Sequence, residues 1–122
     1  MRGVNICVVG GNLGRDPEGR STSDGKRMVT FSLALSRKVK GIDREDDKES
    51  LLWVTVVCFG DLAQICERNL SKGDEVLVHG GLSVNEWEDR ATGEKQRSWE
   101  IQAKDVSFLK VRKWGERQQA RI

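Results

Sequence analysis

Three aromatic side chains, those of Trp53, Phe59 and Trp87, have a spacing that favours contact with flat, stacking groups. Trp53 and Phe59 belong to the uncharged segment Leu51 to Gly60, whose β-branched and aromatic composition predicts a strand. Because strand side chains alternate between faces, Trp53 and Phe59 share one face and lie roughly 20 Å apart. This separation suits several planar groups in a row, and nucleic-acid bases are the obvious candidates.

The opposite face of the same strand is also apolar. It carries Leu52, Val54, Val56 and Cys58. One face can line the core of a small domain, but a second face that carries Trp53 and Phe59 needs a subunit, a ligand or another layer of structure against it. A protein whose aromatic face serves only subunit assembly is therefore an alternative to a ligand-binding protein.

The rest of the chain predicts further strands and one helix around this strand. The expected strands are Val4 to Gly10, Met28 to Ser36, Glu75 to Trp87 and Trp99 to Phe108. A helix is expected after the central strand, with Asp61 as its N-cap and with Leu62, Ile65, Cys66 and Leu70 at helical spacing. Gly10 to Gly14 is expected to form a turn or a barrel corner, and Arg15 to Arg27 a polar loop with room for a hairpin.

This order of elements predicts an all-β fold. Five strands with one short helix between the third and the fourth is the layout of the OB-fold barrel. The binding surface of that fold is the face of strands 2 and 3, flanked by two loops. Trp53 and Phe59 lie on the predicted third strand, and Trp87 lies at the mouth of the loop between the fourth and fifth.

The length of 122 residues fits one domain, along which charge is unevenly distributed. The net charge is +2, but the segment from Lys104 onward has six basic and two acidic residues, so the preceding body is close to neutral. We expect a binding domain over residues 1–111 and a short, basic, disordered tail over residues 112–122. No apolar run approaches about 18 residues and no leader-like segment opens the chain, which favours a soluble cytoplasmic protein without membrane contacts.

Residues that could support catalysis or bind a metal are few. Cys7, Cys58 and Cys66 lack a CxxC spacing and are expected to be small buried hydrophobes, and His79 is the only histidine, so no zinc site is expected. The Gly10 to Gly14 cluster lacks the GxGxxG spacing of a phosphate-binding turn. We therefore expect no cofactor, no metal and no enzymatic activity, with a small enzyme as the alternative from another functional class.

Several short motifs resemble those of a known family. They are Arg2-Gly3-Val4-Asn5, Gly11-Asn12-Leu13-Gly14-Arg15-Asp16-Pro17-Glu18, Phe31-Ser32-Leu33-Ala34, Trp53, Phe59-Gly60, Leu62-Ala63, Lys72-Gly73 and Trp87. From Arg2 to about Leu109 the chain resembles the bacterial single-stranded DNA-binding proteins. The resemblance implies sequence-independent binding and protection of single-stranded DNA in replication, recombination or repair, by a homotetramer built as a dimer of dimers. By the same resemblance, bases stack on Trp53, Phe59 and Trp87.

Two further sets of residues complete the predicted sites. The basic side chains that could hold phosphates are Arg37, Lys38, Lys40, Lys72, Arg90, Lys95 and Arg97. Val4, Ile6 and Val8 share one face of the first strand, and we expect them to meet a second copy of the chain because a small barrel buries only the other face.

The sequence also departs from the family pattern. Val39 stands where an aromatic residue is common, Val54 where histidine is usual, and Asp61 and Glu86 where basic residues are favoured. Replication or repair proteins are candidate partners, although the family's acidic, Phe-ended tip is absent from this sequence, which ends with Arg117 to Ile122. The alternative function within the same fold is that of a primosomal accessory protein, which would act mainly through protein partners.

Overall fold

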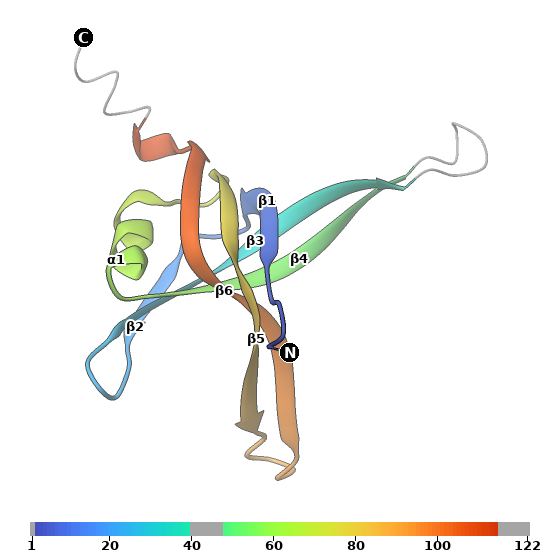
Figure 1. Cartoon of the computed structure of the whole chain (residues 1–122), viewed down its shortest axis with the longest axis vertical. Coiled ribbons are helices and arrows are strands. Elements are labelled where there is room, and N and C mark those ends of the chain that lie inside the picture. The colour runs from blue at the N-terminus through green and yellow to red at the C-terminus, as the bar shows by residue number, and fades with distance from the viewer. Residues whose placement is uncertain (1, 40–47, 115–122) are drawn as a thin grey trace.

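The computed structural model describes residues 2–39 and 48–114, which contain six strands and the helix α1 (Figure 1). In chain order these elements are β1 (Cys7–Leu13), β2 (Glu18–Ser21), β3 (Arg27–Val39), β4 (Lys48–Phe59), α1 (Gly60–Asn69), β5 (Glu75–Glu88) and β6 (Lys95–Lys110). All the predicted elements are present. The short strand β2 lies in the segment that we expected to be a polar loop, and it forms a hairpin with β3.

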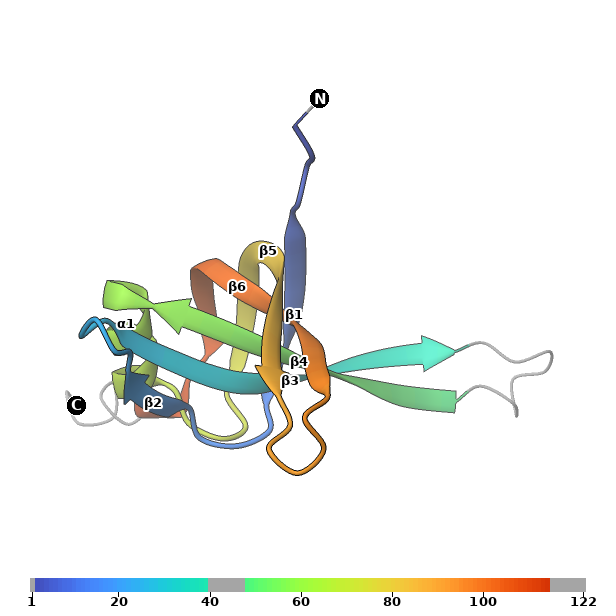
Figure 2. The same ribbon diagram turned by 90° about the horizontal axis from the view of Figure 1, so that it is seen from below.

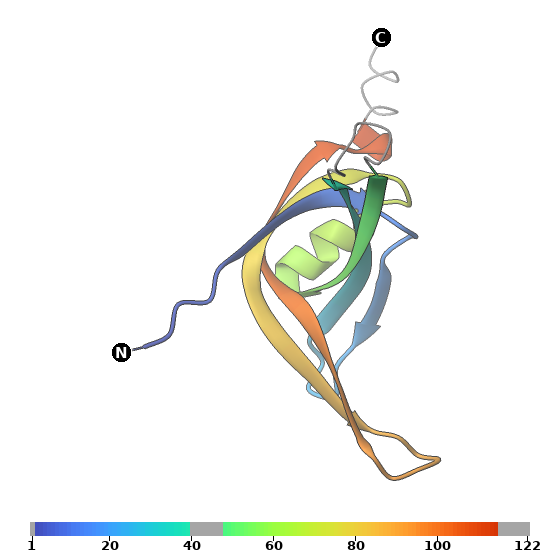
Figure 3. The ribbon, with the colours of Figure 1, turned by 90° about the vertical axis from the view of Figure 1, so that its right-hand side faces the viewer.

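Five of the strands close into a barrel. Neighbouring strands run in the order β1, β5, β6, β4, β3, and β1 pairs with β3 to close the ring, while β2 pairs with β3 outside it. Figure 3 looks into this ring, with α1 framed by the strands. Because α1 lies between β4 and β5, the structure confirms the OB-fold predicted from the order of the elements.

The core consists of apolar side chains that alternate inward along the strands. Strands β3 to β6 contribute core side chains that are each at most 3% exposed: Val29, Phe31, Leu33, Val56, Cys58, Val76, Val78 and Ile101. Ala63 and Cys66 from α1 join the same cluster and are fully buried. The apolar face of the helix is therefore packed against the barrel, and removal of these side chains from water is the main stabilising term of the fold.

β1 approaches β3 closely where the barrel closes. A Cβ added to Gly11 would lie 2.4 Å from the carbonyl oxygen of Ala34, so only a glycine allows this approach. The turn that we predicted at Gly10 to Gly14 is wrong over its first part, because β1 continues through both glycines to Leu13. The alternative interpretation, a barrel corner, is correct. Glycine marks a close approach of two backbones here, not a reversal of the chain.

The ends of two elements also differ from the prediction. β1 begins at Cys7 rather than Val4, although Asn5 still contacts β5: its Nδ2 donates to the carbonyl oxygen of Leu82 (2.9 Å), and its Oδ1 accepts from the Leu82 N–H (2.8 Å). Asp61 is not the N-cap of α1. Phe59 occupies that position without a side-chain hydrogen bond, and Asp61 lies in the first turn, where the helix dipole stabilises a carboxylate.

Two pairs of strands extend from the barrel as arms, which diverge from each other (Figures 1 and 2). β3 and β4 stay paired as far as Val39 and Lys48, and β5 and β6 stay paired as far as Glu88 and Lys95. The predicted phosphate ligand Lys40 lies outside the described residues.

The chain remains packed beyond the predicted domain end at residue 111. The Arg112 N–H donates to Oδ1 of Asp74 (3.1 Å), and the Trp114 ring lies 5.1 Å from that of Phe108, centroid to centroid. Trp114 Nε1 also donates to Oδ1 of Asn69 at 3.3 Å. Residues 112–114 therefore belong with the barrel, and the rest of the predicted tail, residues 115–122, lies outside the described residues.

Leu33 provides a test of the core. Replacing it by Ala should lower the free energy of unfolding by ~2–5 kcal/mol, because the fully buried side chain would leave a cavity. The midpoint of urea denaturation measures this change. Leu109→Ala is the matched control, since Leu109 is 56% exposed, and its effect should stay within about 0.5 kcal/mol. Equal losses in the two variants would contradict the assignment of Leu33 to the core.

Candidate nucleic-acid interface

The outward face of β4 forms the centre of the candidate interface. Along this face lie Trp53, Thr55, Val57 and Phe59, which pair with Ala34, Ser32, Thr30 and Met28 of β3. β2 extends the surface, because its residues Glu18 and Arg20 pair with Thr30 and Met28. The alternation predicted for the central strand is thus correct along the barrel: Val56 and Cys58 face the core while Trp53 and Phe59 face away from it.

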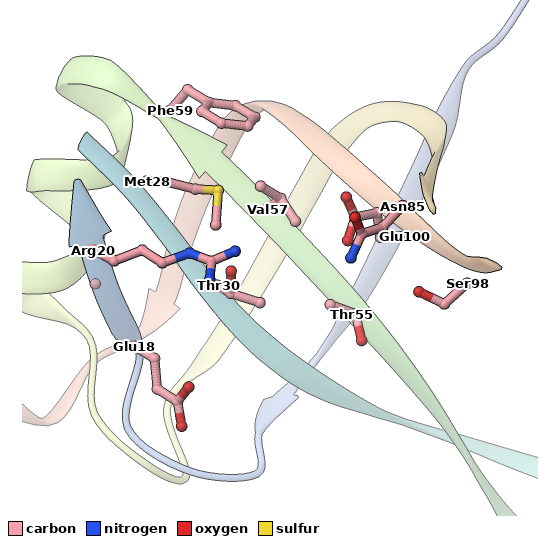
Figure 4. A pocket seen from close by; sticks show the side chains of 11 residues that line it. Glu18, Arg20, Met28, Thr30, Thr55, Val57, Phe59, Asn85, Ser98 and Glu100 are labelled. Atoms are coloured by element: carbon pink, nitrogen blue, oxygen red, sulfur yellow. The ribbon is translucent and has the colours of Figure 1, made fainter. Parts of the chain in front are cut away.

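A hollow of about 470 Å³ lies between this surface and the arm formed by β5 and β6 (Figure 4). The residues that line it are Glu18, Gly19, Arg20, Met28, Thr30, Thr55, Val57, Phe59, Asn85, Ser98 and Glu100. Figure 4 shows the Arg20 side chain extending across β3 towards Thr30, with Asn85, Ser98 and Glu100 on the opposite side. The hollow therefore combines an apolar floor with polar walls contributed by distant parts of the chain.

Trp53 lies on the same strand face as Thr55, next to the first hollow, and lines a second, smaller hollow. Its side chain is 57% exposed, and Gly14, Arg15 and Ser32 line the same hollow of about 300 Å³. A largely exposed indole on a regular strand offers an open ring face. Trp53 is therefore suited to stack on a planar ligand.

Phe59 is the least exposed of the three predicted stacking residues. The Nζ atom of Lys26, in the loop between β2 and β3, lies 5.6 Å from the centroid of its ring. A lysine ammonium at this distance is attracted to the ring face. A planar ligand that stacks on this face of Phe59 would therefore displace the Lys26 ammonium or share the ring with it.

Trp87 lies on β5, two residues after Asn85 and on the same face of the strand. Its side chain is 47% exposed and it pairs with Gln96 of β6. The fold therefore places Trp53, Phe59 and Trp87 around one surface. Trp99, which is 64% exposed, lies on the opposite face of the same arm, where it pairs with Val84.

The predicted phosphate ligands are spread over several faces. Arg37, Lys72 and Arg90 are exposed. Arg37 lies on the face of β3 that points into the core along the barrel, whereas Ala34, which pairs with Trp53, lies on the other face. Lys95 and Arg97 lie on the face of the arm opposite to Trp87. Arg97 also pairs with Glu86 at 3.5 Å.

Lys38 belongs to β3, but its side chain, like the whole of Lys40, lies outside the described part of the chain. The structure thus places the aromatic residues around one surface, whereas the five predicted cations whose side chains are described are spread over several faces.

Sequence reasoning missed the charged residues of the hollow. Arg20 and Glu18 lie in β2, whose polar composition resembled that of a loop, and Glu100 reaches the hollow only through the path of β6. Burial raises the pKa of the Glu100 carboxyl, and the positive charge of Arg20 opposes this rise. Alternation along β5 and β6 was the only signal that could have identified Asn85, Ser98 and Glu100 as neighbours.

Two of the three free cysteines lie buried in the core. Cys58 and Cys66 are buried, and a hydrogen bond with the Cys66 thiol, together with burial, raises the pKa of the Cys58 thiol far above its ordinary value. Among residues 2–39 and 48–114, no group of histidine, cysteine and carboxylate side chains could hold a metal ion. No helix in the same ranges has the length and apolar character needed to cross a bilayer.

Comparison with known proteins assigns the family. The sequence profile of the Single-strand binding protein family matches residues 4–109. The chain belongs to this family. It is similar to "Single-stranded DNA-binding protein 1" of Chlorobaculum tepidum, with 38% identity over 108 residues, which are 88% of this chain and 66% of that protein.

A second relative and a solved structure extend the comparison. A protein of the same name from Xylella fastidiosa is 38% identical over 109 residues, covering 89% of this chain and 79% of the relative. The solved structure titled "Plasmodium falciparum SSB complex with ssDNA" is similar to this chain, with a TM-score of 0.80 and 23% identity. The matched region covers 89% of this chain and 97% of the chain in that structure. At this identity the structural match supports the OB-fold. This chain spans just under two thirds of the length of the Chlorobaculum relative.

Arg20 allows a direct test of the electrostatics in the hollow. Because its positive charge favours the ionised form of Glu100, Arg20→Gln should raise the pKa of Glu100 further. Titration of the Glu100 carboxyl carbon by NMR measures this pKa. Arg97→Gln removes the same charge from the other face of the arm and should leave the pKa of Glu100 unchanged. An identical Glu100 titration in the wild type and Arg20→Gln would exclude the interaction.

Proposed function

We propose that this protein binds single-stranded DNA with little dependence on base sequence, as a coating protein without catalytic activity. The observation that carries the proposal is the placement of two exposed tryptophans beside one hollow. Thr55 and Asn85 line the hollow. Trp53 lies two residues before Thr55 on β4 and is 57% exposed, and Trp87 lies two residues after Asn85 on β5 and is 47% exposed. An extended chain of bases is the ligand that fits a row of open rings and polar walls.

Stacking explains both the preference for single strands and the tolerance of sequence. Every base has a π-face, so an aromatic side chain binds all bases with ~1–3 kcal/mol per base. In a duplex these faces are covered by neighbouring base pairs. A protein that binds through Trp53, Phe59 and Trp87 should therefore select unpaired strands.

The charge distribution supports binding that depends less on phosphate contacts than is usual for a basic protein. Glu18 and Glu100 line the hollow with Arg20, and Glu86 is paired with Arg97. For single strands, the logarithm of the affinity falls with the logarithm of salt concentration at ~0.7 per phosphate contact. A shallow salt dependence is thus part of the proposal.

The names of the relatives support the same function. The Chlorobaculum and Xylella proteins are both called single-stranded DNA-binding proteins, and the Plasmodium structure is titled as a complex with single-stranded DNA. Action in replication, recombination or repair belongs to this proposal. A cytoplasmic site of action beside the nucleoid is consistent with three cysteines that are free rather than bridged.

Self-association is a second part of the proposal, and it rests on β1 and the residues before it. Val4, Ile6 and Val8 are 83%, 66% and 59% exposed, while the alternate residues Cys7 and Val9 pack against the core. Leu77 on the neighbouring strand adds apolar surface on the same side, since it pairs with Gly10. A two-fold contact with a second copy would cover this surface, and a dimer of dimers would give the homotetramer.

Substitution of the tryptophans tests the binding surface. Trp53→Ala and Trp87→Ala should each weaken binding of an oligo(dT) strand by ~1–3 kcal/mol, because each removes one stacking platform. Fluorescence anisotropy with a labelled oligonucleotide measures the affinity. Trp99→Ala is the matched control, since Trp99 is also exposed but lies on the opposite face of the arm, and this variant should bind as tightly as the wild type. Equal affinity of the wild type for duplex and single strand would refute the proposed function.

Charges placed on β1 test self-association. The wild type at micromolar concentration should sediment as an oligomer, and the double variant Ile6→Asp, Val8→Asp should approach the monomer mass of 13.7 kDa, because burial of two carboxylates is costly. Leu109→Asp carries a similar change on an exposed residue of β6 and should keep the wild-type mass. A wild type that sediments as a monomer would refute this part of the proposal.

A further inference from the structure

The indole ring of Trp53 lies against the backbone of Gly14. A Cβ added to Gly14 would lie 2.5 Å from Cζ3 and 2.9 Å from Cη2 of Trp53. Real Cβ atoms do not approach other atoms so closely, so any side chain at position 14 would move the ring or the loop. Because Trp53 is still 57% exposed, the contact with Gly14 leaves much of the ring open to a ligand.

The conformation of the backbone does not explain the glycine. The glycines with a left-handed φ are Gly25, Gly60, Gly73 and Gly93, and Gly14 is not one of them. Gly14 therefore lacks the left-handed φ that by itself would require a glycine. The steric limit comes from Trp53.

The segment around Gly14 is held from two sides, so it forms a firm support. The Gly14 N–H donates to the carbonyl oxygen of Ser32 (3.0 Å), and Leu13 exchanges backbone hydrogen bonds with the connection between α1 and β5. Two residues after Gly14, Oδ1 of Asp16 accepts from the Lys72 N–H (2.8 Å). A support that is bonded to both β3 and the α1–β5 connection limits the tilt of the Trp53 ring before any ligand binds.

The space beside the ring is suited to one nucleotide. Gly14, Arg15, Ser32 and Trp53 line a hollow of about 300 Å³, which is at the small end of the range for ligand pockets. Arg15 is exposed and forms no ion pair with any residue in the described ranges. Its guanidinium group is thus available to a phosphate next to a base that is stacked on Trp53.

We propose that Gly14, Arg15, Ser32 and Trp53 form a subsite for a single nucleotide, in which Gly14 sets the tilt of the stacking ring and Arg15 binds the adjoining phosphate. This inference rests on the proposed binding of single-stranded DNA. Gly14 is a positioning residue that acts through Trp53, and Arg15 contacts the phosphate of the DNA strand directly. Pre-organisation of the ring reduces the conformational entropy that is lost on binding.

A double-mutant cycle tests the role of Gly14. Gly14→Ala should weaken binding of an oligo(dT) strand by roughly fivefold or more in the wild-type background, since it disturbs one stacking platform. In the Trp53→Ala background, the same substitution should change the affinity by less than about twofold, because the ring on which it acts is gone. Gly3→Ala is the control: a Cβ at Gly3 has no atom within 4 Å, and it should have no effect in either background.

A readout without DNA separates positioning from a general loss of structure. The contribution of Trp53 to the fluorescence spectrum, obtained by difference from the Trp53→Ala chain, should change in Gly14→Ala while the circular dichroism spectrum does not. An unchanged Trp53 contribution, or an equal loss of affinity in both backgrounds, would overturn the positioning role.

The role of Arg15 is tested independently of the Gly14 variant. Arg15→Gln should reduce the slope of log affinity against log salt by ~0.7, the value for one phosphate contact with a single strand. Arg68→Gln removes the same charge from an exposed position on α1 and should leave the slope unchanged. Equal slopes for Arg15→Gln and the wild type would overturn the assignment of Arg15.

The proposed function and the proposed subsite can be refuted separately. If the wild type binds no single-stranded oligonucleotide, the proposed function fails and this subsite fails with it. If the wild type binds but neither the cycle nor the salt slope shows the expected effect, only the subsite is refuted.

Discussion

Closure of the barrel depends on the close approach of β1 to β3 at Gly11. No side chain fits between Gly11 and the carbonyl oxygen of Ala34, and the pairing of β1 with β3 completes the ring. The same crossing determines where the following residues lie. Because β1 ends on β3, the Gly14 N–H can donate to the carbonyl oxygen of Ser32, and both residues line the same hollow as Trp53.

β4 forms a wall that the core and the candidate interface share. Val56 and Cys58 are fully buried on one face, and this burial fixes the rotation of the strand about its own axis. Since alternate residues point the other way, Trp53 and Phe59 are directed outward by the same packing that stabilises the barrel. A slip of one residue in the register would move the aromatic side chains into the core and the aliphatic ones to the surface.

The candidate interface is more aromatic than basic. Lys26 lies over Phe59, and Arg20 shares the hollow with Glu18 and Glu100. Cations and carboxylates thus alternate over short distances, so no long basic stripe forms along the described surface. Such a surface favours contacts with the faces of bases, where attraction comes from stacking, over a track of phosphate contacts.

The sequence was enough to predict the five barrel strands, the helix and the faces of the strands, because local composition and alternation report directly on secondary structure and burial. It predicted the OB-fold order, the inward residues of β4 and the outward position of Trp53. It could not show that Lys26 covers Phe59, that Glu100 faces Arg20, or that Gly14 supports Trp53. These contacts join residues far apart in the chain, and their positions follow from barrel closure and strand bending, which local sequence patterns do not encode.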